Sequence, residues 1–365
     1  MKRSTILISL IIVSLYNDYS LAQAVTFNGQ ASAWAAITEK WKAGITYIPE
    51  LRIAHSLAEG NDLDAEISLN SYTWAWLDTP EDFGNNAHLK LYRAWLRYAS
   101  AHLEGRLGLQ RINFGPAKIL RTLMWFDRLD IRDPLELTDG VYAGLLRYYF
   151  LNNANIWVWG LYGNEGLKGS EVYETDNDEL EFGGRFQYPL PRGEIAFSVN
   201  RRFVEQEDWR KKTFIRMQDG RENRFALDGN WDIGIGLWFE TSTAEIRIDR
   251  NEKLWQNMLT LGSDYTFAGG IHVLFEHFFQ STKSDIHQLE TRDSISALSI
   301  DYRLGVMDSL NGIGYYDWNQ ERVYYYFGWL RTYDNWQFNL CGFSSREETG
   351  AFAGQGGQFM VIYNH

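Results

Sequence analysis

Hydrophobic and polar residues alternate with a period of two along much of the chain. In Asp64–Asn70 every odd-numbered position is apolar, and Glu179–Tyr188 and Glu194–Asn200 repeat the pattern. Successive side chains of a strand point to opposite faces, so each segment has one apolar and one polar face. A soluble β-sandwich or β-propeller would show the same alternation. The pattern therefore predicts strands and leaves two all-β classes open.

The lengths of the segments and of their connections favour a membrane barrel. Eighteen candidate strands run from 29–41 and 44–57 to 356–364, and many exceed ten residues, as a tilted strand that crosses a bilayer requires. Short turns largely alternate with long polar connections, a pattern typical of outer-membrane barrels. The short turns are at 100–101, 152–153, 190–192, 233–234, 269 and 334, and the long connections at 78–86, 115–139, 164–177, 205–221, 282–292 and 346–355. This predicts a transmembrane antiparallel up-and-down β-barrel of 16–18 strands, with short periplasmic turns and long extracellular loops, as one domain over 23–365.

Aromatic residues support this placement. The chain contains 15 Trp, 21 Tyr and 21 Phe, and they gather near segment ends, as at Tyr72–Trp76 and Tyr324–Trp329. Barrels carry aromatic girdles at both membrane interfaces. An aromatic-packed soluble core is the alternative. The last segment, Phe359–Tyr363, looks like the closing strand that the barrel-assembly machinery recognises, although two residues follow Tyr363.

The N-terminus has the features of an export signal. Lys2 and Arg3 precede the short apolar run Thr5–Leu15, and Ser20-Leu21-Ala22 offers small residues at a cleavage site. We therefore expect a cleaved signal peptide over 1–22 and a location in the bacterial outer membrane. A membrane anchor is the alternative, but a spanning helix needs about 20 apolar residues.

Charge and cysteine content narrow the function. The formal net charge of −12 argues against a nucleic-acid partner and against docking on an anionic lipid surface. With Cys341 as the single cysteine, the chain has no internal disulfide. Cys341 lies in a strand-like segment, so we interpret it as structural rather than nucleophilic. We expect no cofactor, and outer-membrane lipid and small polar solutes as partners.

Charged side chains are predicted to line the lumen. An arginine that faces lipid at mid-depth costs about 2–4 kcal/mol, so Arg93 and Arg97 should point inward while Tyr92, Leu96 and Tyr98 face lipid. The same parity places other charged residues inward: Asp64, Glu66, Glu104, Arg106, Arg147, Glu179, Glu181, Arg185 and Glu276. Such charges filter ions, or they only pair with one another. Both readings are open.

The longest connection, 115–139, is too apolar for a free loop, because it contains Ile119, Leu120 and the run Leu123–Phe126. We expect it to fold back into the barrel and narrow the pore. Its cations would then lie at the constriction: Lys118, Arg121, Arg128 and Arg132.

The stretch Gly108–Gly115 (GLQRINFG), followed by Asp133-Pro134 and by Gly140–Tyr148, resembles alginate-export-type porins and related bacterial porins over about residues 90–160. This resemblance implies a monomeric barrel with an arginine-lined passage for anionic sugars or acids. By position, Arg111 and Arg147 would carry that role. The chain differs from the family pattern in having Phe114 where Trp is commoner, and in its net acidity.

The predicted function is a porin-like channel for passive diffusion of small polar or charged solutes. A non-conducting barrel, as an assembly subunit or surface anchor, is the alternative, and a barrel hydrolase is a further one. His272, Glu276 and His277 lack the i, i+2 spacing of zinc ligands on a strand, so we expect neither catalysis nor metal binding there. The acidic segment 171–181 is interpreted as a solvated outer loop, where weak calcium binding is left open.

Overall fold

The alternating segments form long antiparallel strands in the computed structural model of the chain. It describes residues 23–57, 60–79, 82–208, 213–249, 252–283, 293–345 and 352–365. The predicted signal peptide, residues 1–22, lies outside the described residues. Within the described part, no helix is long and apolar enough to cross a membrane.

Eighteen strands form the wall, and the two-residue β8 pairs with β10 beside it. The strands are β1 (Gln23–Ile37), β2 (Trp41–Leu57), β3 (Asn61–Thr79), β4 (Asp82–Ala99), β5 (Leu103–Gln110), β6 (Val141–Tyr149), β7 (Asn155–Leu161), β8 (Glu174–Thr175), β9 (Glu181–Leu190), β10 (Gly193–Asp208), β11 (Thr213–Asp232), β12 (Gly236–Asp249), β13 (Glu252–Thr266), β14 (Ile271–Lys283), β15 (Asp293–Arg303), β16 (Asp308–Asp317), β17 (Arg322–Tyr333), β18 (Trp336–Ser344) and β19 (Gln355–Asn364).

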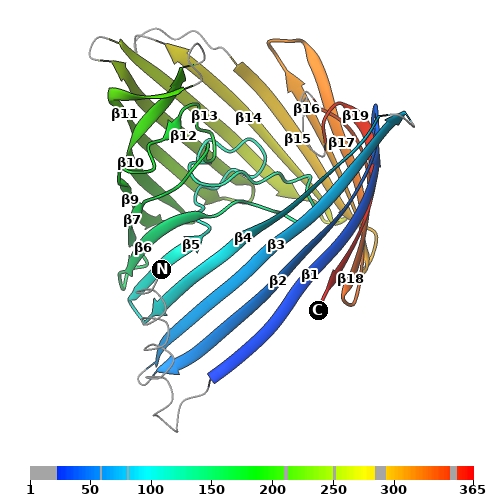
Figure 1. The fold of residues 1–365 in the computed structure, drawn as a ribbon, viewed down its shortest axis with the longest axis horizontal. Coiled ribbons are helices and arrows are strands. Elements are labelled where there is room, and N and C mark those ends of the chain that lie inside the picture. Colours follow the sequence, from blue (N-terminus) through cyan, green and yellow to red (C-terminus); the bar gives the residue numbers. More distant parts are fainter. Residues whose placement is uncertain are drawn as a thin grey trace.

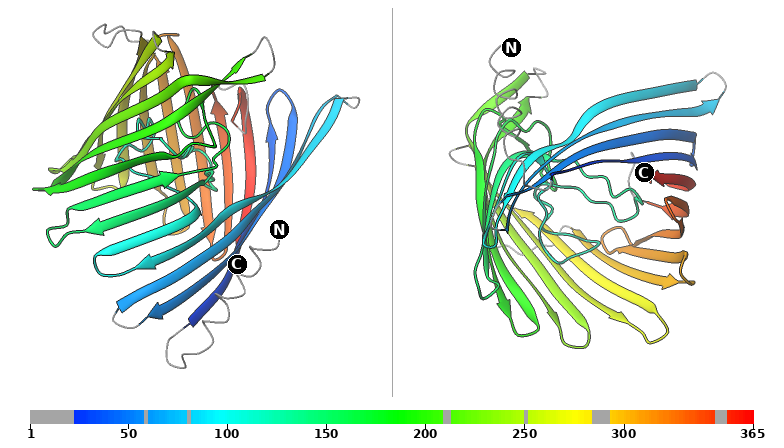
Figure 2. Two further views of the ribbon diagram at one scale, coloured as in Figure 1. Left: turned by 60° about the vertical axis from the view of Figure 1, so that its left-hand side comes forward. Right: turned by 90° about the horizontal axis from the view of Figure 1, so that it is seen from below.

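The first and last strands close the wall into a ring. Trp34 of β1 lies opposite Gly44 of β2 on one side and Met360 of β19 on the other, and all three strands are antiparallel neighbours. Figure 2 shows this ring from below. Closure matters because hydrocarbon offers no water to satisfy the N–H and C=O groups of an open sheet edge. The predicted antiparallel barrel is confirmed, at the upper end of the predicted strand number.

The two faces of the wall differ as the alternation predicts. The outer face exposes large apolar side chains around the ring, among them Leu51, Ile67, Leu146, Phe182, Leu298 and Phe359. Inward neighbours on these or adjacent strands are often polar and buried, as at Ser68, Ser198, Ser299 and Gln358. Contact between the apolar face and hydrocarbon therefore stabilises the closed wall.

The two ends of the barrel also differ. The start of β1 and the end of β19 lie at the end where short turns such as 191–192 and 334–335 connect the strands. The opposite end carries the long connections 111–140 and 162–180. By the rule for outer-membrane barrels, the short-turn end is periplasmic and the other end extracellular.

Some predicted boundaries are wrong. The first hairpin turns at 38–40. The loops expected at 78–86 and 205–221 are mostly strand, since β3 and β4 leave only 80–81 between them, and β10 and β11 only 209–212. A strand that continues beyond the bilayer needs no apolar face, so the alternation fades before the strand itself ends.

The prediction that Tyr92 faces lipid is also wrong. The register between β3 and β4 shifts at this point, because Ser68 pairs with Arg93 while the next residue, Leu69, pairs with Leu91. Tyr92 is the extra residue of this β-bulge, and its hydroxyl accepts a hydrogen bond from Thr138 N–H in the 111–140 connection. A one-residue bulge re-aims side chains, and the alternation alone does not reveal it.

An arginine on the outer face should destabilise the barrel according to its depth. We predict that Leu298→Arg, at the middle of β15, lowers the free energy of unfolding by about 2–4 kcal/mol, because the charge would face hydrocarbon. Leu151→Arg, in the turn 150–154 where the side chain is 91% exposed, should cost about 1 kcal/mol or less. Denaturant titrations in lipid vesicles measure both values. Equal costs for the two variants would contradict the assignment of the outer face.

Candidate functional site

The connection between β5 and β6, residues 111–140, lies inside the ring and not above it (Figures 1 and 2). This lumen loop first packs against β6 and β7, is then bound by β12 and β14, reaches β16–β18, and returns along β4. The predicted infolding is therefore observed.

Two buried glutamates hold the loop against the wall. Oε1 of Glu240 on β12 accepts a hydrogen bond from Ala117 N–H (2.9 Å), and its Oε2 accepts bonds from the N–H groups of Thr122 (2.8 Å) and Leu123 (2.9 Å). Glu276 on β14 accepts the N–H groups of the intervening residues 118, 119 and 120 at 2.6–2.9 Å. Neither glutamate has a solvent-exposed surface. Bonds to a charged acceptor are stronger than neutral ones, so six backbone donors compensate two buried charges.

Neighbouring residues fix this arrangement. Trp238 Nε1 donates to Glu276 Oε1 (3.0 Å), and the hydroxyls of Thr122 and Thr260 lie 2.9 Å apart. Gly115 has φ of 96°, and a Cβ there would lie 2.3 Å from Glu240 Oε1. Glycine at this position therefore allows both the left-handed turn and the close approach of the carboxylate.

Behind the anchor, the lumen loop packs into a dry cluster. The ring of Phe114 stacks on Trp159 of β7 with centroids 5.7 Å apart and meets Trp125 edge-on at 5.4 Å. Ile112, Leu123 and Phe126 of the loop join the same cluster, whose remaining members lie on β6, β7 and β11. The apolar residues from which we predicted that this connection is not a free loop thus form a core inside the barrel.

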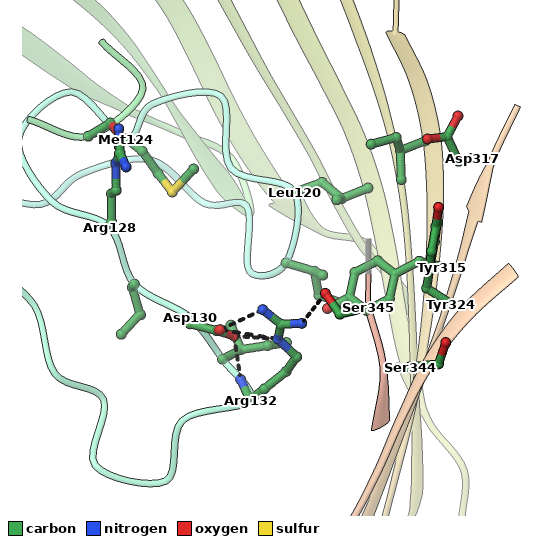
Figure 3. A pocket seen from close by; sticks show the side chains of 15 residues that line it. Leu120, Met124, Arg128, Asp130, Arg132, Tyr315, Asp317, Tyr324, Ser344 and Ser345 are labelled. Atoms are coloured by element: carbon green, nitrogen blue, oxygen red, sulfur yellow. Dashed lines mark hydrogen bonds and ion pairs between the residues drawn. The ribbon is translucent and has the colours of Figure 1, made fainter. Parts of the chain in front are cut away.

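The tip of the loop reaches the opposite wall. Arg132 Nε and Nη2 lie 2.8 and 2.7 Å from the two carboxylate oxygens of Asp130, and its Nη1 donates to Ser345 Oγ at 3.3 Å (Figure 3). The Arg132 guanidinium lies over the ring of Phe352. Ile131 packs against the buried cluster on β16–β18. The loop therefore bridges the lumen between two apolar clusters.

The returning arm is tied to β4. Arg93 donates to Thr138 O (2.9 Å) and to Thr138 Oγ1 (3.1 Å), and Lys90 pairs with Asp139. Asp133 shapes the preceding turn, because its carboxylate accepts the N–H of Leu135 at 3.0 Å. Burial raises the pKa of this carboxyl above its usual value. Arg93, a predicted pore-lining residue, therefore ties the returning arm to β4, and its predicted role in selectivity stays a prediction.

The prediction of a solvated acidic loop at 171–181 is wrong. Glu171 and Glu181 are buried, and Lys168 Nζ lies 3.2 Å from the first and 3.1 Å from the second. Arg202 of β10 also lies 3.4 Å from Glu171. The segment thus packs into the lumen through ion pairs, and its partners on the wall were not identifiable from the acidic run itself.

This second segment, 162–180, supports the lumen loop. Ser170 N–H donates to Met124 O at 2.8 Å, and Arg128 Nε donates to Gly169 O. A Cβ on Gly169 would lie 1.9 Å from Met124 O, so the two segments approach too closely for any other residue.

Most predicted pore arginines are paired with acids. Arg97 binds Asp64. Glu104 lies between Arg106 (3.3 Å) and Arg147 (3.5 Å), so one carboxylate faces two cations. These five residues lie on β3–β6 near the periplasmic end, and the triplet Arg106–Glu104–Arg147 has one more cation than acid.

The same pattern recurs around the loop. Asp127 lies 3.4 Å from both Arg111 and Arg121. Arg185 on β9 binds Asp228 on β11 through two parallel bonds of 2.6 and 2.7 Å. The predicted residues are therefore brought together in pairs and triplets with acids, and two of the triplets carry an excess cation.

Three of the cavities formed by the described residues adjoin the lumen loop. The extracellular cavity, 360 Å³, lies between the loop and β15–β18, where Tyr315 and Tyr324 line it. The lateral cavity, 400 Å³, lies between the loop, the 162–180 segment and β2–β4, and Lys90 and Leu137 line it. The periplasmic cavity, 430 Å³, lies below the loop against β7 and β9–β13, and Lys118 and Arg185 line it. Polar space thus remains on both sides of the loop.

Sequence reasoning missed Glu240, although it is an inward acid on a strand, and found Glu276 only as a lumen charge. His272 lies 3.1 Å from Asp264 and 3.5 Å from Asp301, at the periplasmic end of β14. The described residues contain no group of three His, Cys, Asp or Glu side chains arranged to hold a metal.

Solved structures with the same architecture are bacterial outer-membrane proteins. OccAB1 of Acinetobacter baumannii superposes with a TM-score of 0.59 at 6% identity, covering 94% of this chain and 95% of that one. OccK5 (OpdH) of Pseudomonas aeruginosa gives 0.57 at 10% identity, with coverage of 94% and 97%. An anion-selective porin from Comamonas acidovorans gives 0.50 at 12% identity, with coverage of 94% and 100%. The chain has the fold of the outer-membrane porins. No protein-family model and no curated protein matches the sequence.

Loss of the two carboxylates should release the lumen loop. In the double variant Glu240→Gln/Glu276→Gln, each position loses charge-assisted bonds that are worth about 1.5–3 kcal/mol apiece. We predict that trypsin then cleaves the loop after its lysine and arginine residues in the folded barrel, whereas the wild-type loop resists.

Glu245→Gln provides the control, because Glu245 lies on β12 but pairs with Lys253 (2.8 Å) and not with the loop. This variant should retain wild-type resistance to trypsin. Unchanged resistance in the double variant would show that the apolar clusters alone hold the loop.

Proposed function

We propose that the protein is an outer-membrane porin-like channel through which small polar or charged solutes diffuse passively. The observation that supports this most is a closed barrel whose infolded loop leaves polar cavities on both of its sides. A hydrated lumen lowers the cost of moving polar solutes across hydrocarbon, while charges at the narrow level filter them. Export through a cleaved signal peptide and insertion by the barrel-assembly machinery belong to this proposal.

A plugged barrel is the second candidate, because two dry clusters occupy part of the lumen. Such a barrel would serve as an assembly subunit or surface anchor. We propose transport rather than catalysis, since the acids and bases of the lumen are engaged with one another or with the loop backbone.

Conductance separates the two candidates. The purified protein in planar bilayers should show discrete openings, and deletion of residues 117–136 should raise the single-channel conductance, because the loop occupies the narrow level of the lumen. A silent bilayer with a folded barrel would favour the plugged alternative. Unchanged conductance after the deletion would show that the loop does not limit the pore.

We infer the charge of the preferred solute from the two triplets Arg106–Glu104–Arg147 and Arg111–Asp127–Arg121. Arg111 and Arg147 each share one carboxylate with a second arginine, so we propose that both sites favour anions over cations. This matches the passage for anionic sugars or acids that the resemblance implies.

Replacing one arginine of a triplet should abolish its excess charge. We predict that Arg147→Gln shifts the reversal potential under a salt gradient toward cation permeation. Arg147→Lys keeps the charge and should retain the wild-type potential. Identical potentials for wild type and Arg147→Gln would mean that the triplets only satisfy their own charges.

A further inference from the structure

Three cations lie side by side on the outer face of the wall, towards the extracellular ends of β11, β12 and β13. Arg221 is directly opposite Arg247, and Arg247 is directly opposite Lys253, so the three form a row across neighbouring strands (Figure 1). The row faces outward, because the adjacent residues Glu222 and Ile246 are buried on the lumen side. Like charges in directly opposite positions of a sheet repel one another. The row is therefore unfavourable unless an anion lies beside it.

The wall supplies less negative charge than this row needs. Oε1 of Glu245, on the same face of β12, lies 2.8 Å from Lys253 Nζ and 3.5 Å from Arg247 Nη2. Arg201 of β10 adds a fourth cation at the level of Glu245. In the part of the chain that the structure describes, no carboxylate pairs with Arg201 or Arg221. The described side chains thus place four cations around one acid, and we refer to the four as the basic patch: Arg201, Arg221, Arg247 and Lys253.

The depth of the basic patch is that of the lipid headgroups. Phe225 of β11, an exposed apolar residue of the outer face, lies four positions from Arg221 on the periplasmic side. Four residues span about 13 Å along a strand, which is about 10 Å in depth for a strand tilted as in such barrels. Trp255 follows Lys253 on the outer face of β13, and tryptophan is enriched at the membrane interface. The basic patch therefore meets headgroups of the outer leaflet.

Phosphate is the headgroup anion that fits these cations. Guanidinium groups bind phosphate oxygens through two parallel N–H bonds, and an ammonium group binds them as a point charge. A phosphomonoester carries nearly two negative charges at neutral pH, so it offsets most of the excess of the patch. With a net charge of −12, the chain as a whole repels anionic lipid, and attraction has to come from a local cluster of this kind.

We propose that the basic patch binds the phosphate headgroup of a lipid in the outer leaflet. The phosphate lies against Arg221 and Arg247, and the acyl chains run down the apolar outer face beside Phe225. The inference goes beyond the proposed channel and does not depend on it, because a folded barrel that does not conduct has the same patch.

Native mass spectrometry of the mature protein in detergent micelles measures lipid binding directly. The probes are phosphatidic acid, whose headgroup is a phosphomonoester, and phosphatidylcholine, whose headgroup has no net charge. We expect saturable binding of phosphatidic acid that excess inorganic phosphate does not displace, because the free ion lacks acyl chains. Equal binding of the two lipids would overturn the proposal. Displacement by inorganic phosphate would overturn it as well, since it would show a site for a soluble anion.

A double substitution tests the location. Arg221→Gln/Arg247→Gln should weaken the binding of phosphatidic acid by roughly thirtyfold, as expected for the loss of two cations near a lipid surface. Arg303→Gln/Arg331→Gln is the matched control, because it removes two exposed arginines at the periplasmic ends of β15 and β17 and changes the net charge equally. Equal weakening by both double variants would show that total charge attracts the lipid, and would refute the assigned patch.

Substitution of the acid should have the opposite effect. Glu245→Gln increases the positive excess of the basic patch, so we expect it to strengthen the binding of phosphatidic acid. Arg221→Lys/Arg247→Lys keeps both charges and should retain most of the affinity. A Glu245→Gln variant that gains no affinity would contradict the electrostatic basis of the site.

Discussion

Two buried carboxylates that accept hydrogen bonds from the loop backbone, Glu240 and Glu276, determine where the lumen loop lies. A buried carboxylate must be compensated, and here backbone N–H groups of residues 117–123 provide the compensation. The dependence is mutual, because these donors would otherwise be unsatisfied inside the barrel. The anchor sets the start of the loop on β12 and β14, and the tip then reaches β16–β18. The three cavities follow from this path.

The charges of the lumen are organised on a different principle. Where the loop is anchored, Glu240 and Glu276 bind backbone N–H groups; many other acids of the lumen bind arginine or lysine, as in the Arg185–Asp228 pair. A lumen lined by many free arginines would repel itself, whereas sharing one acid between two arginines leaves a small excess at a defined place. Glu104 and Asp127 are these shared acids. If the barrel conducts as we propose, its selectivity depends on this residual charge and not on the number of arginines.

Much of the fold could be predicted because lipid imposes a local rule on the sequence. Each strand in the bilayer must present apolar residues at every second position. This alternation predicted the barrel, the number of strands and the inward position of the charged residues. The infolding of 111–140 was also predictable, because its apolar run has no place in water. Where the rule does not apply, prediction failed, as in the strand extensions beyond the bilayer and the bulge at Tyr92.

The partners of the site residues could not be predicted, because they depend on contacts between distant segments. Glu240 binds an amide 123 positions away in the chain, and Glu171 meets Arg202 only through the ring order of the strands. The acidic segment 171–181 resembles a solvated loop when it is considered alone, because a basic partner such as Arg202 lies elsewhere in the sequence.

The apolar content of the lumen loop exceeds what its anchoring needs. Phe114 and Trp125 fill the cluster on β6 and β7, and Ile131 fills the one on β16–β18. Leu129, between these clusters, joins neither of them and lines open space. A side chain that only had to keep the loop soluble in a wet lumen would be polar at that position. Leu129 therefore continues the apolar surface that Leu120 and Ile131 of the same loop give this cavity.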